Sequence, residues 1–349
     1  MHYLRFLSPP KVAEGPRSSL TVNAVLAATT DLGDHFYPGD LTLRARVVDG
    51  LHHCKVFQSQ DFVCPSYSRA LKISLVLPGK YVSRDGCVHV AVNKSDTTTI
   101  DDGRFPKVLD VWSAQFVLTD KQRAEPMVER RLTMSNGSAL RVLEETGDSI
   151  ARHIWDASLG FLRFFDHVFS TTETSSELQQ LLLRKRKRPL RVIELGAGCG
   201  IVGIAFAQLV KSDVLLTDLD DALDILNSNI RLAAPAAGSR LEAMVLDWSE
   251  CLASTSTQYD IILVSDCIYN PDSSVHLVET LQRLSKQTPV PLILVGYKHR
   301  HSADQVFFDQ MRQAKFTTIA TDTIQLSCSK SDDDEAGPAI EFYEYRLQP

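Results

Sequence analysis

Four glycines between two apolar segments have the clearest potential for chemistry in this chain. Gly196, Gly198, Gly200 and Gly203 follow residues 190–195, whose apolar pattern predicts a buried strand. Glycine lets the backbone approach a ligand where a Cβ atom would clash. An apolar helix is predicted to follow, and the first turn of a helix offers unpaired N–H groups. The spacing therefore predicts a site for a nucleotide-like cofactor at the carboxyl end of the strand.

Two cofactor motifs overlap in this loop. Gly198, Gly200 and Gly203 fit the G-x-G-x-x-G fingerprint of dinucleotide-binding proteins. The segment from Glu194 through Gly196 to Gly200 instead fits the E-x-G-x-G-x-G loop of S-adenosylmethionine enzymes. Glu194 lies two residues before the first glycine, near the place where the ammonium end of that methyl donor would be held. The choice between the two cofactors decides what reaction the chain performs.

Polar and aromatic side chains follow three further predicted strands. In an open parallel sheet a ligand binds beyond the carboxyl ends of the strands. Asp218 follows the second strand, where a carboxylate can accept hydrogen bonds from the ribose hydroxyls of either cofactor. After the third strand, Asp247 is positioned to accept the adenine amine and Trp248 to cover the adenine ring. Residues 266–269 follow the fourth strand, where the reactive end of a cofactor would lie.

The elements that must position these residues alternate between strand and helix from residue 190 onward. This order predicts a mostly parallel sheet covered on both faces, a Rossmann-like α/β fold. The sheet is predicted to end in an antiparallel pair, whereas a dehydrogenase would repeat a second nucleotide-binding half, so the methyl donor is favoured. Strands are predicted at 191–194, 214–217, 242–246, 259–265, 290–295, 316–326 and 340–346, helices at 201–210, 222–232, 274–284 and 303–314, and an acidic turn at 332–335.

The first part of the chain has a different pattern. Residues 41–47 alternate apolar and polar side chains, and residues 71–77 and 88–92 do so in part. Turn signals bound each segment, which predicts an antiparallel, sandwich-like sheet. We expect a β-rich accessory domain at 1–125, with a structural, partner-binding or substrate-binding role, and a catalytic domain at 126–349. Smaller predictions are a loop at 94–111, a hairpin at 129–143 around Asn136-Gly137, a helix at 154–169 and a loop at 170–180.

Bulk composition limits the classes of protein to which the chain can belong. The 349 residues are 44% hydrophobic and 23% charged, no apolar run approaches a membrane span, and the seven cysteines are scattered singly. We therefore expect a cytoplasmic protein, with the nucleus as a second candidate location, and a monomer is favoured. The net charge of −6 argues against attraction to nucleic acid or membrane. The basic run 184–188 fits a solvated loop better than a nuclear import signal, and His299 and His301 lack partners for a metal site.

Four short segments of the chain together resemble the methyltransferase family 16 group. They are residues 155–158 (Trp-Asp-Ala-Ser), 194–200, 246–248 (Leu-Asp-Trp) and 266–269 (Asp-Cys-Ile-Tyr). The resemblance covers residues 128–346 and implies a class I, seven-stranded, S-adenosylmethionine-dependent methyltransferase. Many members of the group are protein lysine methyltransferases. The Asp-x-x-Tyr segment combined with Trp-Asp is more specific than the glycine loop, which all class I methyltransferases share.

The resemblance also implies roles for individual positions. Asp266 and Tyr269 would meet the methyl group and the acceptor. Many members have Tyr-Glu-x-Arg where residues 297–300 are Tyr-Lys-His-Arg, and Lys298 in place of the carboxylate bears on the acceptor's identity. The donor site would be lined by Trp155, Glu194, Gly196, Gly198, Asp218 and Trp248, to which we add Gly200, Asp247 and Ser265 from the same loop and strand ends.

The leading functional hypothesis is methylation of a lysine side chain in a protein. Transfer from a sulfonium is an in-line displacement that needs alignment and water exclusion. A lysine ammonium must first lose a proton, and we assign Asp266 to binding and orienting it rather than to general-base work. Tyr269 would add an aromatic wall or a hydroxyl contact. The alternatives are a small-molecule N-methyltransferase and a non-catalytic adaptor that retains the cofactor fold.

Overall fold

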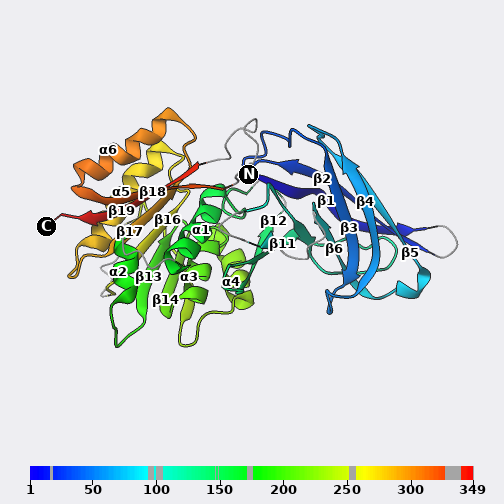
Figure 1. The fold of residues 1–349 in the computed structure, drawn as a ribbon, viewed down its shortest axis with the longest axis horizontal. Coiled ribbons are helices and arrows are strands. Elements are labelled where there is room, and N and C mark those ends of the chain that lie inside the picture. Colours follow the sequence, from blue (N-terminus) through cyan, green and yellow to red (C-terminus); the bar gives the residue numbers. More distant parts are fainter. Residues whose placement is uncertain are drawn as a thin grey trace. The chain divides into compact units, whose positions relative to one another are not determined.

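The computed structural model describes residues 1–15, 19–92, 98–99, 105–145, 147, 149–170, 176–250, 257–326 and 339–348. The acidic turn predicted at 332–335 lies outside these residues. The chain divides into two compact units, and Figure 1 labels most of their helices and strands. The first unit is formed by Met1–Ile100, Phe105–Thr133 and Arg141–Ser149, and the second mainly by Met134–Leu140 and Ile150–Pro349.

The first unit is a sandwich of two sheets. One sheet has four strands in the order β5-β2-β1-β8, and the other has eight, with β12-β11-β9-β6-β3-β4 as its main path. Alternate side chains of both sheets share one apolar core, which includes Leu26, Leu43, Leu75 and Val90. The strands are β1 (His2–Glu14), β2 (Leu20–Thr29), β3 (Leu41–Asp49), β4 (Val56–Cys64), β5 (Leu71–Leu77), β6 (Asp85–Ala91), β7 (Thr98–Thr99), β8 (Val108–Leu109), β9 (Val111–Ser113), β10 (Phe116–Val117), β11 (Met127–Thr133) and β12 (Ala139–Glu145), with one 3-10 helix, η2 (Gly79–Tyr81).

The strands predicted at 41–47, 71–77 and 88–92 lie in β3, β5 and β6. The loop predicted at 94–111 is wrong in part, because β7, β8 and the first residue of β9 fall in it, while residues 94–97 and 100–104 lie outside the described part. The predicted hairpin forms as β11 and β12, and β11 pairs with β9 of the first unit. The division of the chain between residues 125 and 126 stays a prediction.

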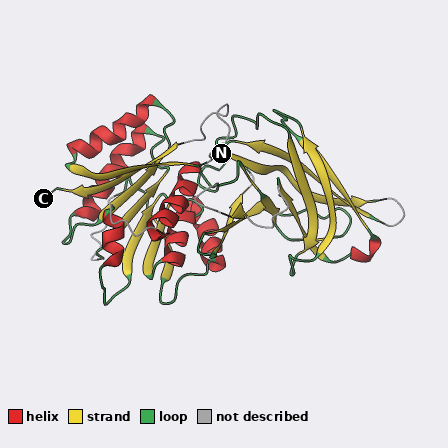
Figure 2. Ribbon diagram, viewed as in Figure 1, coloured by secondary structure: helices red, strands yellow, loops and turns green. Residues whose placement is uncertain are grey.

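The second unit is built on a seven-stranded sheet with the order β15-β14-β13-β16-β17-β19-β18. Its first five strands are parallel, and β19 runs antiparallel to both of its neighbours, as the sequence predicts. Helices cover both faces (Figure 2). The strands are β13 (Leu190–Leu195), β14 (Ser212–Asp218), β15 (Arg240–Val245), β16 (Ile261–Ser265), β17 (Leu292–Tyr297), β18 (Phe316–Gln325) and β19 (Ala339–Leu347).

Aromatic and aliphatic side chains hold the helices to this sheet. On one face Phe165 of α1 contacts Phe206 of α3, with ring centroids 5.4 Å apart. On the other face α5 and α6 pack together and bury residues such as Leu281 and Phe307 against the strands. The helices are α1 (Asp156–Ser170), α2 (Glu177–Leu183), α3 (Ile201–Leu209), α4 (Leu223–Leu232), α5 (Pro271–Ser285) and α6 (Gln305–Gln313), with the 3-10 turns η3 (Asp220–Ala222) and η4 (Ser302–Asp304).

Helix α2 corrects the loop predicted at 170–180. Ser176 begins the helix by accepting a hydrogen bond from the Gln179 N–H at 3.1 Å, and Leu178 and Leu181 are buried. Among the helices that the structure describes, none combines the length and the apolar character needed to cross a membrane. Because β14 and β16 flank β13 on opposite sides, the carboxyl ends of these three strands meet at the switch point of the sheet.

Candidate active site

The glycine loop leaves β13 in a conformation that ordinary residues avoid. Gly196, Gly198 and Gly200 have φ angles of 65°, 54° and 77°, and Gly200 is the residue before the first turn of α3. At Gly196 there is also no room, since a Cβ atom would lie 2.5 Å from Cys267 Sγ. The first of these three glycines is therefore required both by backbone conformation and by close approach to the chain after β16.

Glu194 stands beneath the first turn of α3. Its side chain is buried, and its Oε2 accepts a hydrogen bond from the Gly203 N–H at 2.8 Å. Burial raises the pKa of this carboxyl group to about 8. The contact ties the end of β13 to helix α3, which follows it. The role predicted for Glu194 at the ammonium end of the donor stays a prediction.

Asp218 links the end of β14 to the same loop. Its Oδ2 accepts a hydrogen bond from the Gly198 N–H at 2.7 Å, and its Oδ1 accepts one from the Leu219 N–H at 2.7 Å. Burial raises the pKa of this carboxyl, and the two N–H donors oppose the shift. Since a carboxylate offers about four acceptor positions, these two bonds leave capacity for hydroxyl donors.

Trp248 and Asp247 follow β15, and they differ in environment. The Trp248 ring lies 3.1 Å from the position that a Cβ atom of Gly196 would take. Its Nε1 is buried and makes no hydrogen bond among the residues that the structure describes. Asp247 accepts hydrogen bonds from the hydroxyl and the N–H of Ser249, which lower the pKa of its carboxyl. A buried indole N–H beside a crowded glycine loop fits a cofactor with a polar heterocycle.

The segment before α1 borders the glycine loop. The carbonyl oxygen of Ala151 lies 2.9 Å from the position that a Cβ atom of Gly198 would take. Arg152 donates to the Asp221 carbonyl at 2.5 Å and to Asp224 Oδ2 at 3.1 Å, which attaches this segment to the start of α4. Trp155 Nε1 donates to the carbonyl of Ile150 at 3.0 Å and closes the segment on itself. Trp155 was among the predicted donor residues, and Arg152 was not.

The end of β16 places the predicted acceptor residues. Ser265 Oγ lies 3.2 Å from Ser158 Oγ of α1. Asp266 has a φ of 54°, and its N–H donates to the Gly296 carbonyl at 3.0 Å. The backbone therefore departs from the extended conformation of β16 at this residue, whose side chain is buried. Tyr269 lies three residues further and is half-exposed. The roles predicted for these residues stay predictions, because no acceptor is present.

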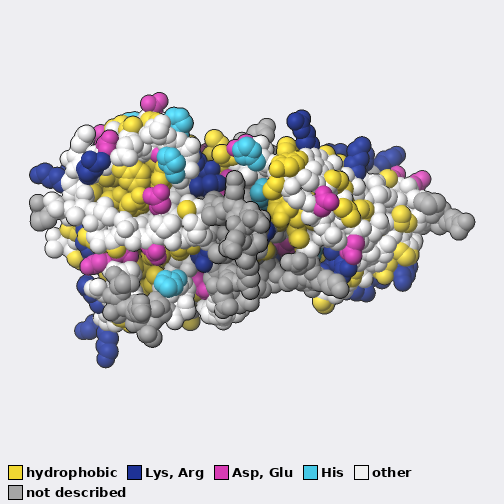
Figure 3. Space-filling view, turned by 45° about the horizontal axis from the view of Figure 1, so that its top comes forward, with side chains coloured by type: hydrophobic (Ala, Val, Ile, Leu, Met, Phe, Trp, Pro, Cys, Tyr) yellow, Lys and Arg dark blue, Asp and Glu magenta, His cyan; other side chains and the backbone are white. Residues whose placement is uncertain are grey.

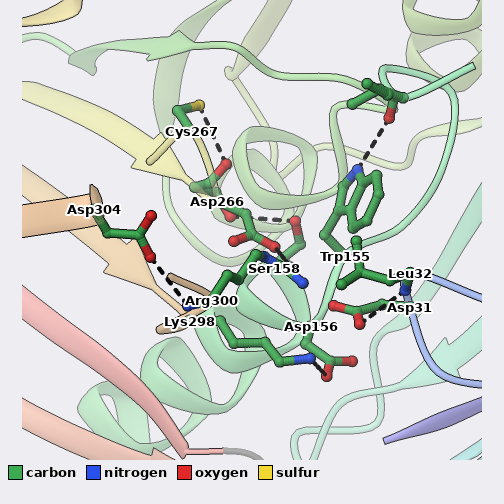
Figure 4. Close-up of polar contacts among 12 residues, drawn as sticks. Asp31, Leu32, Trp155, Asp156, Ser158, Asp266, Cys267, Lys298, Arg300 and Asp304 are labelled. Atoms are coloured by element: carbon green, nitrogen blue, oxygen red, sulfur yellow. Dashed lines mark hydrogen bonds and ion pairs between the residues drawn. The ribbon is translucent and has the colours of Figure 1, made fainter. Parts of the chain in front are cut away.

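Two ion pairs tie the segment after β17 to its neighbours, one to the end of β16 and one to the first residue of α1 (Figure 4). Arg300 Nη2 lies 2.5 Å from Asp266 Oδ2, and Lys298 Nζ lies 2.7 Å from Asp156 Oδ2. The carboxylates are 3% and 0% exposed, so both charges are desolvated and need their partners. The Arg300 guanidinium also lies 5.4 Å from the centroid of the Trp155 ring.

A third carboxylate fixes the backbone that carries these two cations. Asp304 Oδ2 accepts hydrogen bonds from the Tyr297 hydroxyl at 2.8 Å, the Arg300 N–H at 3.0 Å and the His301 N–H at 2.9 Å. Burial alone would raise the pKa of this carboxyl, but the two backbone donors and the hydroxyl lower it on balance. The chain reversal after β17 is therefore rigid where it presents Lys298 and Arg300.

The sequence indicated only part of this arrangement. The segment 297–300 was singled out for its departure from the family pattern, but its pairing with Asp156 and Asp266 has no signal in residue spacing. Among the residues that the structure describes, no group of three His, Cys, Asp or Glu side chains is placed to hold a metal ion.

The basic run 184–188 also has a local explanation. Arg188 forms two hydrogen bonds to Asp260, at 2.7 and 2.9 Å, and Arg186 donates to the Leu181 carbonyl. On the face drawn in Figure 3, Lys and Arg side chains are interspersed with Asp and Glu rather than gathered in one basic surface.

Comparisons with known proteins agree with this geometry. Residues 134–314, just over half of the chain, match the family model described as lysine methyltransferase. The protein N-lysine methyltransferase METTL21A of Xenopus tropicalis is 33% identical over 164 residues, which cover 47% of this chain and 67% of that protein. The protein-lysine N-methyltransferase EFM6 of Saccharomyces cerevisiae is 28% identical over 196 residues, or 50% and 75% of the two chains.

One relative extends over both units. A UPF0665 family protein of Schizosaccharomyces pombe is 28% identical over 321 residues, which cover 89% of this chain and 92% of that protein. The family match begins at residue 134, so it includes the glycine loop, the ends of β14 and β16 and the segment after β17. The chain belongs to the lysine methyltransferase family.

Proposed function

We propose that this chain transfers a methyl group from S-adenosylmethionine to a lysine side chain of a protein. The observation that carries the proposal is one juxtaposition at the carboxyl edge of the seven-stranded sheet. The glycine loop after β13 and the Asp266–Arg300 pair after β16 lie on adjacent strands of a lysine methyltransferase family member. A cofactor on the loop would therefore have its reactive end near Asp266.

The donor would be held by residues from four segments. Gly196 and Gly198 offer close backbone approach, Asp218 offers acceptor capacity to the ribose, and the unpaired indole N–H of Trp248 offers a donor to the heterocycle. Trp155 and the segment before α1 would cover the loop. When bound, S-adenosylmethionine supplies a methyl group that its positively charged sulfur already activates for displacement.

The acceptor would approach between α1 and the ends of β16 and β17. Asp266 and Tyr269 would border the amine, and the buried Ser158–Ser265 pair would limit the entry of water. In-line transfer depends on alignment and desolvation more than on acid–base groups. A lysine amine with an ordinary pKa of about 10.4 must lose its proton first, which costs roughly 4–5 kcal/mol at pH 7.

A protein acceptor is favoured by the relatives, two of which are named as protein lysine methyltransferases. Most of the β-sandwich lies before the family match, while the Schizosaccharomyces pombe relative spans 89% of this chain. We therefore assign the sandwich a role in binding the substrate protein or a partner. A cytoplasmic location fits the composition and the single, scattered cysteines.

The test is transfer of label from S-adenosyl-[methyl-³H]methionine to lysate by the purified chain. A labelled polypeptide is expected with the wild type and not with Asp266→Ala, while Asp309→Ala on the exposed face of α6 serves as the matched control. Label that enters only small molecules would point to the small-molecule alternative. Titration that detects no S-adenosylmethionine binding, or tight binding of NAD instead, would overturn the cofactor assignment.

A further inference from the structure

Two ion pairs lie at the proposed acceptor end of the site, and the net charge of each pair is zero. Asp266 is paired with Arg300 and Asp156 with Lys298, so two negative and two positive charges cancel within a few ångströms. A lysine ammonium that approached Asp266 would also meet the Arg300 guanidinium. A like charge at that distance disfavours the cationic form of the incoming group.

We propose that Arg300, supported by Lys298, makes this site accept the lysine side chain as a neutral amine. This inference rests on the proposed function, and it replaces the ammonium-binding role that the sequence indicates for Asp266. The proton leaves the ammonium to water before the amine is bound. The nitrogen lone pair then forms the N–C bond while the C–S bond breaks and its electrons stay on sulfur. The product nitrogen carries the positive charge that the sulfonium loses.

The other titratable groups around Arg300 do not replace the charge of Asp266. Asp304 accepts hydrogen bonds from three donors. His299 Nδ1 lies 3.9 Å from the Asp304 carboxylate and 2.8 Å from the Tyr297 hydroxyl. Burial raises the pKa of the Cys267 thiol and of the Tyr269 and Tyr297 phenols, so these groups stay neutral. Two carboxyls of the glycine-loop side, Glu194 and Asp218, likewise have pKa values that burial raises.

Neutral binding has a mechanistic benefit at both ends of the reaction. Only the neutral amine has the lone pair that attacks, so a site that excludes the ammonium holds the reactive form. After transfer the nitrogen is positively charged again, and the carboxylates of Asp266 and Asp156 are both already held by cations of the chain. Arg300 is thus a positioning residue that acts through the charge of Asp266, and this role requires no contact with the methyl group.

The experiment counts protons. n-Butylamine, which reproduces the lysine side chain, is titrated calorimetrically at pH 8 into the full-length protein loaded with S-adenosylhomocysteine. Two buffers of different ionisation enthalpy give the number of protons released. At this pH the free amine is almost fully protonated. Binding as a neutral amine therefore releases about one proton per butylamine, and binding as the ammonium releases none.

Four variants separate charge from structure. Arg300→Gln exposes the charge of Asp266, so proton release is expected to fall close to zero and butylamine to bind about tenfold more tightly. Arg300→Lys keeps the cation and should keep the release near one. The double variant Arg300→Gln/Asp266→Asn is neutral again and should restore it. Arg312→Gln removes an arginine that pairs with Asp309 on the exposed face of α6, and is the matched control.

Wild-type binding without proton release, or no saturable butylamine binding, would overturn the inference. An unchanged proton count in Arg300→Gln would do the same, because a merely structural arginine predicts that result. The lysate labelling described above stays independent of these outcomes. A labelled lysine polypeptide with no proton release contradicts only the inference, whereas proton release without any labelled polypeptide contradicts only the proposed function.

Discussion

At the residue scale, Glu194 ties the end of β13 to the first turn of α3. The carboxyl is buried and accepts from the first turn of α3, and burial raises its pKa to about 8, far above the ordinary 4.5. Below pH 4.5 both the folded and the unfolded chain hold this proton. Between pH 4.5 and 8 only the folded chain keeps it, so the stability of the wild type falls as pH rises through this window.

Glu194→Gln is expected to remove this pH dependence. The amide carbonyl can still accept from Gly203, and the variant has no proton to lose. Relative to the wild type, the thermal midpoint should be similar at pH 5 and higher at pH 8, since each pKa unit corresponds to about 1.4 kcal/mol. Glu242→Gln on the exposed strand β15 is the control and should shift little at either pH. A pH-independent difference between Glu194→Gln and the wild type would refute this account of the carboxyl.

The sequence predicts residue types at this scale better than it predicts partners. The carboxylates Glu194, Asp218 and Asp266 were found because each directly ends or follows a predicted strand. Their hydrogen bonds were not, because they depend on which backbone N–H groups the folded loop presents. The Asp266–Arg300 pair spans 34 residues and depends on the adjacency of β16 and β17, which no local pattern encodes.

At the element scale, the turn from β13 to α3 has little room for substitution. Its three left-handed glycines lie between a strand with side chains on both faces buried and a helix with almost every side chain buried. The turn also meets the chain after β16, through Cys267, and the ring of Trp248. A change in this turn is therefore expected to alter both the proposed donor site and the packing of the sheet.

Gly196→Ala tests this coupling. A left-handed φ costs an alanine about 1–2 kcal/mol, and the new Cβ would lie 2.5 Å from Cys267 Sγ. We expect at least tenfold weaker binding of S-adenosylmethionine in a titration, together with a lower thermal midpoint. Gly137→Ala, at φ 82° with nothing within 4 Å of the new Cβ, carries only the backbone cost. Equal effects of the two variants on donor binding would show that close approach at Gly196 is unimportant.

The elements themselves were predicted where their hydrophobic pattern is regular. All seven strands of the sheet in the second unit correspond to predicted segments, and strands such as β13, β16 and β17 are short apolar runs bounded by turn residues. Strand β1 has no such pattern, since Pro9 and Pro10 interrupt it and its register to β2 shifts twice. The loop prediction at 170–180 misses helix α2 because residues 177–180 are mostly polar and only the cap and the leucines mark the helix.

At the scale of the whole molecule, each unit has its own core. In the sandwich the buried Arg130 forms hydrogen bonds to Glu144 Oε1 at 2.7 Å, to the Leu4 carbonyl at 2.8 Å and to the Asp110 carbonyl. These contacts tie β11 to β1, to β12 and to Asp110 between β8 and β9, all within the first unit. The glycine loop and the ion pairs of the acceptor end belong to the second unit alone.

Arg130→Ala should therefore destabilise the protein and spare donor binding. Removing one partner of a buried ion pair costs about 3–5 kcal/mol, which urea unfolding would detect as a midpoint at a lower urea concentration. Arg44→Ala removes a pair between partly exposed side chains, Arg44 and Asp61, and should cost at most about 1 kcal/mol. The affinity for S-adenosylmethionine is expected to stay within about twofold in both variants. Loss of donor binding in Arg130→Ala alone would contradict the independence of the two units.

The central claim is that the methyl group ends on a lysine nitrogen of a protein. The most direct measurement is amino-acid analysis of the polypeptide that the purified chain labels in lysate with S-adenosyl-[methyl-³H]methionine. After acid hydrolysis, the label is expected in Nε-methylated lysine, and Asp266→Ala should abolish it. Label in methylarginine, methylhistidine or only in small molecules would contradict the account.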